Sequence, residues 1–261
     1  MGINNIGKLF YKDYYGEVDF NKLLFDELES EKKKEREKTL SINDTIKNES
    51  SLVKIDKPIT GIVPRRVIVQ YPGILTGVGL EHDVALKDGY KLGMHFDYTH
   101  GMPIIYGSSI KGVLKTYFED FFLKRYPQRE KDLKPLMSLI FDGKNPKFKN
   151  RKDQEPKYVS LYERDAFFDA VIVEPYNDRF LEDESITPHT EGALKNPIPI
   201  KMLKIVPGCE MEFRFKLHTN WINGNKYDSE EKLDLFMEIL ETVGIGAKTN
   251  VGYGQLEIKN S

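Results

Sequence analysis

The chain has 261 residues, enough to bury a substantial core in one large or two small domains. Its 39 basic and 41 acidic side chains leave a formal net charge of −2, which excludes a global basic field, so any nucleic-acid binding must use local patches. The single Cys209 excludes an intramolecular disulfide, and the sequence contains neither a signal peptide nor a membrane-spanning apolar run, so we expect a cytoplasmic protein without a membrane partner.

Residues 1–60 are predicted to form an N-terminal helical extension followed by a linker. Apolar residues at helical spacing indicate a helix over residues 19–40. The mixed charges in its second half are typical of a solvated helix face, which we favour over an RNA-binding tail. Residues 41–59 are rich in Ser, Asn, Asp and Lys, which indicates a linker.

Residues 61–261 are predicted to form one α+β domain. Residues 65–71 indicate a strand, residues 75–80 a glycine-broken edge, and residues 101–105 a second, short strand. We expect Ser108 or Ser109 to cap a helix that ends near Tyr126. The apolar face of this helix is predicted to consist of Ile110, Val113, Leu114, Tyr117, Phe118 and Phe121.

The second half of this domain carries two predicted insertions, a basic one near residues 142–165 and a polar connection over 175–196. The buried strands that we expect there lie at residues 166–173, 198–206, 209–217 and 254–259. Residues 209–217 alternate between apolar and charged, which predicts one buried face and one wet face. Asp228 and Glu231 predict a capping box for a helix that reaches Val243. The resulting order of strands and helices is that of a ferredoxin-like fold with extra strands.

A glycine-rich loop over residues 244–255 connects the last predicted helix to the last strand. Glycine permits positive φ and a close approach to a ligand, and successive N–H groups in such a loop can bind an anion. A Walker loop is excluded because Ala247 separates Gly246 from Lys248. A dinucleotide fingerprint is excluded because Thr249 stands where its third small residue is required. The fingerprint also lies between a strand and a helix, whereas the order here is helix, loop, strand. The alternative is a turn with a purely architectural role.

The loop resembles the glycine-rich loop of the RAMP proteins, the repeat-associated subunits of CRISPR effector complexes. Residues 99–112, THGMPIIYGSSIKG, are similar to the strand–turn–helix motif PxxPGSSxKG of that family, with Tyr106 in place of its second proline. Residues 168–170, 186–189 and 196–201 resemble the sixth subunit of the type III-B (Cmr) complex. Here Thr190 stands where that subunit tends to have an aromatic residue. The resemblance covers residues 64–259.

The resemblance implies a ferredoxin-like (RRM-like) RAMP core within an RNA-guided interference complex. It implies a position near the 3′ end of the guide RNA, with guide RNA, target RNA and other RAMP subunits as partners. Target cleavage in such complexes is attributed to an aspartate of the repeating backbone subunit. By that analogy we expect neither catalytic residues nor a cofactor in this chain.

Two groups of residues are predicted to contact RNA. At the start of the first long helix, N–H groups and the helix dipole favour a phosphate, and the residues there are Gly107, Ser108, Ser109 and Lys111. A serine N-cap without a ligand is the alternative. The loop offers amides, donors and a ring that can stack on a base, from Gly246, Lys248, Thr249, Asn250, Gly252 and Tyr253. A strand-start tyrosine such as Tyr253 is more often a core residue. We add His189, for which loop packing or helix capping is the alternative, and Lys201, which lies near a strand and can neutralise the RNA backbone.

Two other functions remain open at the level of sequence. A ferredoxin-like RNA-processing endonuclease needs a general base, for which His82, His100 and His189 are the candidates. A protein-interaction scaffold would use the glycine loop only as architecture. We expect no metal site, because His82, His95 and His100 lack cysteine partners and a metal-binding spacing. For Asp169 we expect a structural hydrogen bond.

Overall fold

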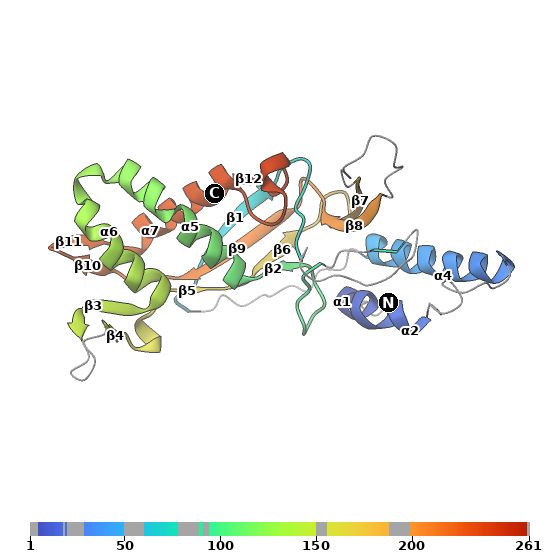
Figure 1. Ribbon diagram of the computed structural model, residues 1–261, viewed down its shortest axis with the longest axis horizontal. Coiled ribbons are helices and arrows are strands. Elements are labelled where there is room, and N and C mark those ends of the chain that lie inside the picture. Colours follow the sequence, from blue (N-terminus) through green and yellow to red (C-terminus); the bar gives the residue numbers. More distant parts are fainter. Residues whose placement is uncertain are drawn as a thin grey trace, which may run out of the picture.

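The fold is described from a computed structural model of the chain (Figure 1). The structure describes residues 5–17, 19, 29–49, 60–77, 89–90, 94–149, 156–187 and 199–259. Within these ranges no helix combines the length and the apolar character needed to cross a membrane.

An antiparallel sheet forms the centre of the protein, with the strand order β12-β1-β9-β6-β2. Its strands are β1 (Val63–Val69), β2 (Ile104–Ile105), β6 (Ala170–Glu174), β9 (Glu210–Lys216) and β12 (Leu256–Ile258). A short strand, β5 (Ala166–Phe167), also pairs with β9. If β1, β6, β9 and β12 are numbered 1 to 4 in chain order, their order across the sheet is 4-1-3-2. This order confirms the predicted ferredoxin-like plan.

Two helices, α5 (Gly107–Arg125) and α7 (Ser229–Val243), pack beside one another against the sheet (Figure 1). The predicted capping box of α7 is present: Asp228 accepts from the Glu231 N–H at 3.0 Å, and Glu231 accepts from the Asp228 N–H at 3.1 Å. On α5 the buried side chains recur every fourth residue, at Ile110, Leu114, Phe118 and Phe122. Tyr117, which we expected on this face, is 41% exposed because it lies off that stripe.

The core between helices and sheet is largely aromatic. Phe236 of α7 contacts Phe215 of β9 and Phe167 of β5, with ring centroids 5.8 Å and 5.7 Å apart. Phe118 meets Phe141 edge to face at 5.4 Å. On β9 the odd-numbered residues from Met211 to Phe215 are fully buried, as the alternation predicted. Packing of these rings fixes the helices, and with them both ends of the glycine-rich loop, to the sheet.

Both predicted insertions contain strands. The basic insertion is a hairpin of β3 (Lys144–Lys149) and β4 (Pro156–Tyr158). The polar connection is not only a loop, because it contains β7 (Leu181–Ile186), which pairs with β8 (Ile200–Ile205) in a separate two-stranded sheet. The expected strand over 166–173 is interrupted at Phe168 and Asp169, between β5 and β6.

The remaining elements are short and connect the main ones. A second small hairpin consists of β10 (Asn220–Ile222) and β11 (Asn225–Tyr227). After α5 the chain forms four short helical segments in two groups: η2 (Pro127–Arg129), α6 (Glu130–Met137), η3 (Ser138–Asp142) and η4 (Leu161–Glu163). In the glycine-rich loop, η5 (Thr249–Val251) is a single 3₁₀ turn.

The N-terminal region is helical, with α1 (Ile6–Lys8), η1 (Leu9–Asp13), α2 (Tyr14–Glu17) and α4 (Glu29–Asn48). The prediction that the helix ends at Leu40 and is followed by a linker was wrong for residues 41–48, which continue α4. Ile42 and Ile46 are buried, and Lys47 forms an ion pair with Asp183 of β7 at 3.0 Å. Burial of this last part of α4 against β7 explains why it stays helical. Residues 20–28 and 50–59 lie outside the described part, and the domain boundary near residue 60 stays a prediction.

Candidate nucleic-acid interface

The glycine-rich loop is held against the segment that follows β1. Gly254 N–H donates to the Gly73 carbonyl at 2.8 Å, and Ala247 N–H donates to the Leu75 carbonyl at 2.8 Å. Within the loop, Ile245 N–H donates to the Gly254 carbonyl at 2.9 Å. Backbone hydrogen bonds therefore close the base of the loop and leave the part between residues 248 and 252 to project.

Two of the loop glycines are required by this close backbone packing. Gly246 and Gly254 have φ values of 103° and 78°, where an L side chain is strained. A Cβ at Gly246 would meet the Leu75 carbonyl oxygen, and one at Gly254 would meet that of Ile245. The architectural role that we kept as an alternative is therefore real for these two positions.

The projecting part of the loop carries the polar donors. Lys248 adopts a left-handed conformation with φ 60° and precedes η5. The side chains of Lys248 and Asn250 are exposed, and that of Thr249 is half-buried. No carboxylate forms an ion pair with Lys248 in the described ranges. Gly252 continues the turn with φ 98°, and a Cβ there would meet the Pro72 ring at 3.9 Å, an ordinary contact distance. The loop thus presents an amide side chain and a cation with no carboxylate partner among the described residues, on a base closed by backbone hydrogen bonds.

Two tyrosines lie near the loop: Tyr253 belongs to it, and Tyr71 lies in the turn after β1. Tyr71 is the more exposed of the two. Tyr253 is half-buried, and burial together with its hydrogen bond to Glu184 raises its pKa to about 12. Tyr71, in the turn after β1, is 81% exposed and lies close enough to Tyr253 to raise that pKa further. Tyr71 is therefore the ring free to stack on a base, and sequence analysis missed it. Its only sequence signal was its position before a Pro-Gly turn.

The start of α5 differs from the prediction. Neither Ser108 nor Ser109 caps the helix; Tyr106 is the N-cap residue, and it makes no side-chain capping bond. Instead the Gly107 N–H donates to the Asp169 carboxylate at 2.7 Å, the structural hydrogen bond expected for Asp169. Gly107 is buried against the Phe167 carbonyl, so the helix start approaches β5 closely.

This arrangement limits phosphate binding at the helix start. The amides of Ser109 and Ile110 donate to the Tyr106 carbonyl at 2.9 Å and 3.1 Å. Among the first four amides of α5, these bonds and the one to Asp169 leave that of Ser108 open. The Asp169 carboxylate also sits where the helix dipole would attract an anion. Lys111 is half-buried and has no ion-pair partner in the described part of the chain.

A short series of contacts connects the start of α5 to the glycine-rich loop. Thr76, next to the loop-paired Leu75, accepts a hydrogen bond from the His95 N–H at 3.2 Å. The His95 ring stacks on Tyr106, with centroids 4.3 Å apart. The two sequence motifs are therefore linked through Leu75, Thr76 and His95.

Lys201 lies on β8 and already has an anionic partner. Its ammonium is 3.4 Å from Asp183, which also pairs with Lys47 and accepts from the Tyr90 hydroxyl. Neighbouring Lys204 is paired with Glu184 at 3.0 Å. These ion pairs partly neutralise both lysines and so weaken their attraction for a phosphate. An RNA contact by Lys201 stays a prediction. His189 lies outside the described residues.

The histidines that the structure describes are not gathered at one place with other metal ligands. His95 is half-buried, and this burial lowers its pKa. The His100 ring contacts the Asp97 carboxylate at 3.0 Å on an exposed turn. Within the described ranges no group of three His, Cys, Asp or Glu side chains is arranged to hold a metal ion. His82 lies outside these ranges.

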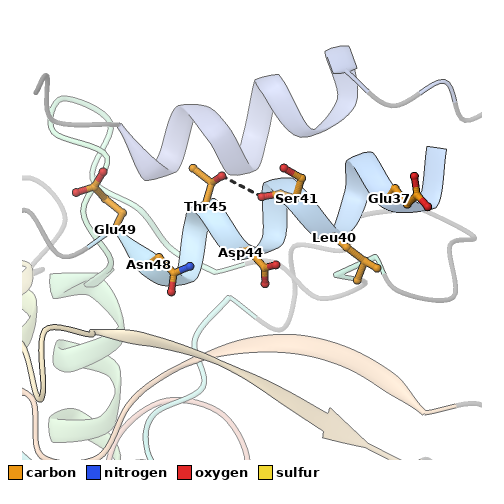
Figure 2. A pocket seen from close by; sticks show the side chains of 7 residues that line it. All are labelled: Glu37, Leu40, Ser41, Asp44, Thr45, Asn48 and Glu49. Carbon is orange, nitrogen blue, oxygen red and sulfur yellow. Dashed lines mark hydrogen bonds between the residues drawn. The ribbon is translucent and has the colours of Figure 1, made fainter. Parts of the chain in front are cut away.

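A shallow hollow on α4 has a different chemical character (Figure 2). It is lined by side chains of that helix, including Glu37, Leu40 and Asp44, and by Glu49, which directly follows the helix. Thr45 uses its hydroxyl to bond the Ser41 carbonyl at 2.9 Å. Because its charged lining is acidic, the hollow repels phosphate and is not part of the candidate interface.

The fold and the loop together define a class of protein: a ferredoxin-like α+β domain with a glycine-rich loop after its second core helix. The family model of the RAMP superfamily matches residues 66–257. The chain therefore belongs to the RAMP superfamily, as its motifs indicated. No curated protein sequence matches the chain.

Solved structures agree on the fold. A chain of the type III-B Cmr-beta complex bound to cognate target RNA is 19% identical, with a TM-score of 0.59, over 99% of this chain and 87% of that chain. Cmr6 from Pyrococcus furiosus is 18% identical over 76% of this chain and 98% of its own, with a TM-score of 0.38. The first likeness establishes a fold resembling that of a type III-B subunit, and the second superposition is too loose to add an argument.

Proposed function

We propose that this RAMP protein is a non-catalytic, RNA-binding subunit of a type III-B CRISPR effector complex in the cytoplasm. It contacts guide or target RNA near the 3′ end of the guide and binds neighbouring RAMP subunits. Membership of the RAMP superfamily and the fold shared with a chain of an RNA-bound Cmr-beta complex support this proposal.

The observation that carries the proposal is the projecting loop, whose Lys248 forms no ion pair with a described residue and whose base is hydrogen-bonded to the turn that carries the exposed ring of Tyr71. A cation for a phosphate and an aromatic face for a base are the two elements of sequence-tolerant binding to single-stranded RNA. Because guide pairing reads the sequence in such complexes, contacts of this protein are expected to be largely sequence-independent.

Fluorescence anisotropy with a labelled single-stranded RNA tests the loop. Lys248→Ala should weaken binding and lower the slope of log K against log salt by about 0.7, the value for one phosphate contact on a single strand. Lys124→Ala, which removes an exposed lysine near the far end of α5, is the matched control. Equal slopes for the two variants would remove Lys248 from the interface.

A second measurement tests the assembly. Affinity purification of the tagged protein from its own cell should recover other RAMP subunits together with repeat-derived guide RNA. Recovery of the protein alone, without RNA, would contradict the proposal.

The endonuclease alternative is favoured by one observation, the exposed His100–Asp97 pair. The carboxylate accepts from the His100 backbone N–H and contacts its ring Nδ1, which leaves Nε2 open as a general base. Incubation of the pure protein with repeat RNA decides the question. Specific cleavage that disappears in His100→Ala would replace the non-catalytic proposal.

A further inference from the structure

The β3–β4 hairpin and the turn after it hold two cations on one exposed aromatic ring. The ammonium of Lys144 and the guanidinium of Arg164 each lie 5.2 Å from the centre of the Tyr158 ring. Arg164 is fixed further, because its Nε donates to the Val159 carbonyl at 2.9 Å. The ring of Tyr158 is 57% exposed, so the two cations are presented near the surface.

These two positive charges have no anionic partner among the residues that the structure describes. Of the acidic side chains nearby in sequence, Asp142 pairs with Lys115 at 2.7 Å and Asp165 pairs with the buried Lys232 at 2.5 Å. Glu163 is exposed and forms no ion pair with another described residue. Both cations are therefore open to an external anion as far as the described residues go, and phosphate groups are suitable counter-ions for them.

Exposed apolar side chains stand directly beside the cations. Leu161 is 76% exposed and Tyr162 is 83% exposed, and both lie on the short η4 turn that brings Arg164 back to Tyr158. Single exposed apolar residues need no explanation, but three large ones within five positions beside two cations form a patch. The ring of Tyr158 is already engaged by the two cations, whereas the ring of Tyr162 makes no ring or cation contact with any described residue.

We propose that this hairpin surface, formed by Lys144, Tyr158, Leu161, Tyr162 and Arg164, binds single-stranded RNA. Lys144 and Arg164 each hold a phosphate, and Tyr162 stacks on an adjacent base. Tyr158 positions the two cations. An acidic peptide would satisfy the charges, but phosphate and base together match both the cation pair and the free ring.

The hairpin surface is separate from the glycine-rich loop. In Figure 1, β3 and β4 are drawn away from the end of the sheet where β12 follows the loop. The inference adds a second RNA contact to the proposed function, and its choice of RNA as the ligand rests on that function. The two sites share no residue, so separate variants distinguish them.

The test measures binding of the full-length protein to labelled oligouridine of about 20 nucleotides, long enough to cover several stacking sites. Tyr162→Ala should weaken binding about tenfold, as expected for loss of one base stack. Lys144→Ala should lower the salt slope by about 0.7, because one phosphate contact is lost. Tyr98→Ala is the matched control, since Tyr98 is 101% exposed on the separate turn that carries His100. Neither test residue donates a structural hydrogen bond in the described chain.

The outcomes separate the two sites. Weaker binding by Tyr162→Ala and Lys144→Ala, with normal binding by Tyr98→Ala, supports the hairpin surface. If both hairpin variants bind like the control while Lys248→Ala is weakened, the hairpin proposal fails and the proposed function stands. If the unaltered protein does not bind oligouridine, both are contradicted. Normal RNA binding combined with loss of subunits from the purified complex would make the surface a protein-docking site and overturn the inference.

Discussion

At the scale of single residues, a glycine of the loop can be compared with a glycine of a helix. The loop glycine needs a positive φ and has no room for a side chain, whereas neither holds for the helix glycine. Gly254 has φ 78° and no room for a Cβ, so Gly254→Ala should destabilise the protein by about 2 kcal/mol or more. Gly112 lies in α5 with nothing within 4 Å of its Cβ position. Gly112→Ala should therefore raise the free energy of unfolding by about 0.5–1 kcal/mol. Urea unfolding of both variants checks the pair, and equal stabilities would contradict the tight loop base.

Asp132 is a buried carboxylate that holds the β10–β11 hairpin to α6. It accepts from the Tyr227 hydroxyl at 2.7 Å and from the amides of Asn223 and Asn225 at 2.8 Å and 2.6 Å. Asp132→Ala leaves these donors without their acceptor and should cost about 2–4 kcal/mol in the free energy of unfolding. Asp234→Ala, which changes an exposed aspartate of α7, should have little effect.

The same carboxylate gives this loss a pH dependence. Burial alone would raise the pKa of Asp132, but the hydrogen bonds from Tyr227, Asn225 and Asn223 outweigh it and hold the pKa below its ordinary 3.8. A depressed pKa in the folded state stabilises above pH 3.8, and that contribution disappears as the pH falls through the folded value. Wild type and Asp132→Ala should therefore converge in stability in acid. A difference that does not shrink as the pH falls below 3.8 would contradict this assignment.

At the scale of elements, local patterns were predictable and tertiary ones were not. The capping box of α7 and the alternation of β9 depend on residues adjacent in sequence, and both were found as expected. The cap of α5 comes from Asp169, 62 positions away, so no local pattern showed that it would replace Ser108 or Ser109. Strand β7 is rich in acidic residues, and its pairing with β8 gives it an order that its composition did not indicate.

The docking of α4 on β7 is testable as a property of that element. Ile46 is fully buried, so Ile46→Ala should cost about 2–4 kcal/mol and speed hydrogen exchange in both α4 and β7. Leu40, 37% exposed on the rim of the hollow in Figure 2, is the control, and Leu40→Ala should change the stability little. Unchanged exchange in β7 after Ile46→Ala would show that α4 does not brace that strand.

At the scale of the whole molecule, the sequence was sufficient for the fold because the order of elements specifies a ferredoxin-like sheet. It was less informative about the interface. Lys248 and Lys201 were both predicted to contact RNA, yet Lys248 forms no ion pair with a described residue, whereas Lys201 is paired with Asp183 through the folding of β7 onto β8. The exposure of Tyr71 likewise depends on how the loop closes over the turn after β1, which spacing along the chain does not reveal.

The overall charge makes a last prediction about RNA binding by the complete protein. A net charge of −2 supplies no long-range attraction, so the salt dependence must come from local cations. If Lys111, Lys248, Lys144 and Arg164 each meet one phosphate, the slope of log K against log salt should be about −3, since each contact on a single strand contributes about 0.7. Titrations from low to physiological salt measure this slope. A value near zero would show that stacking rather than phosphate contact dominates, and one twice as steep would place further lysines on the RNA.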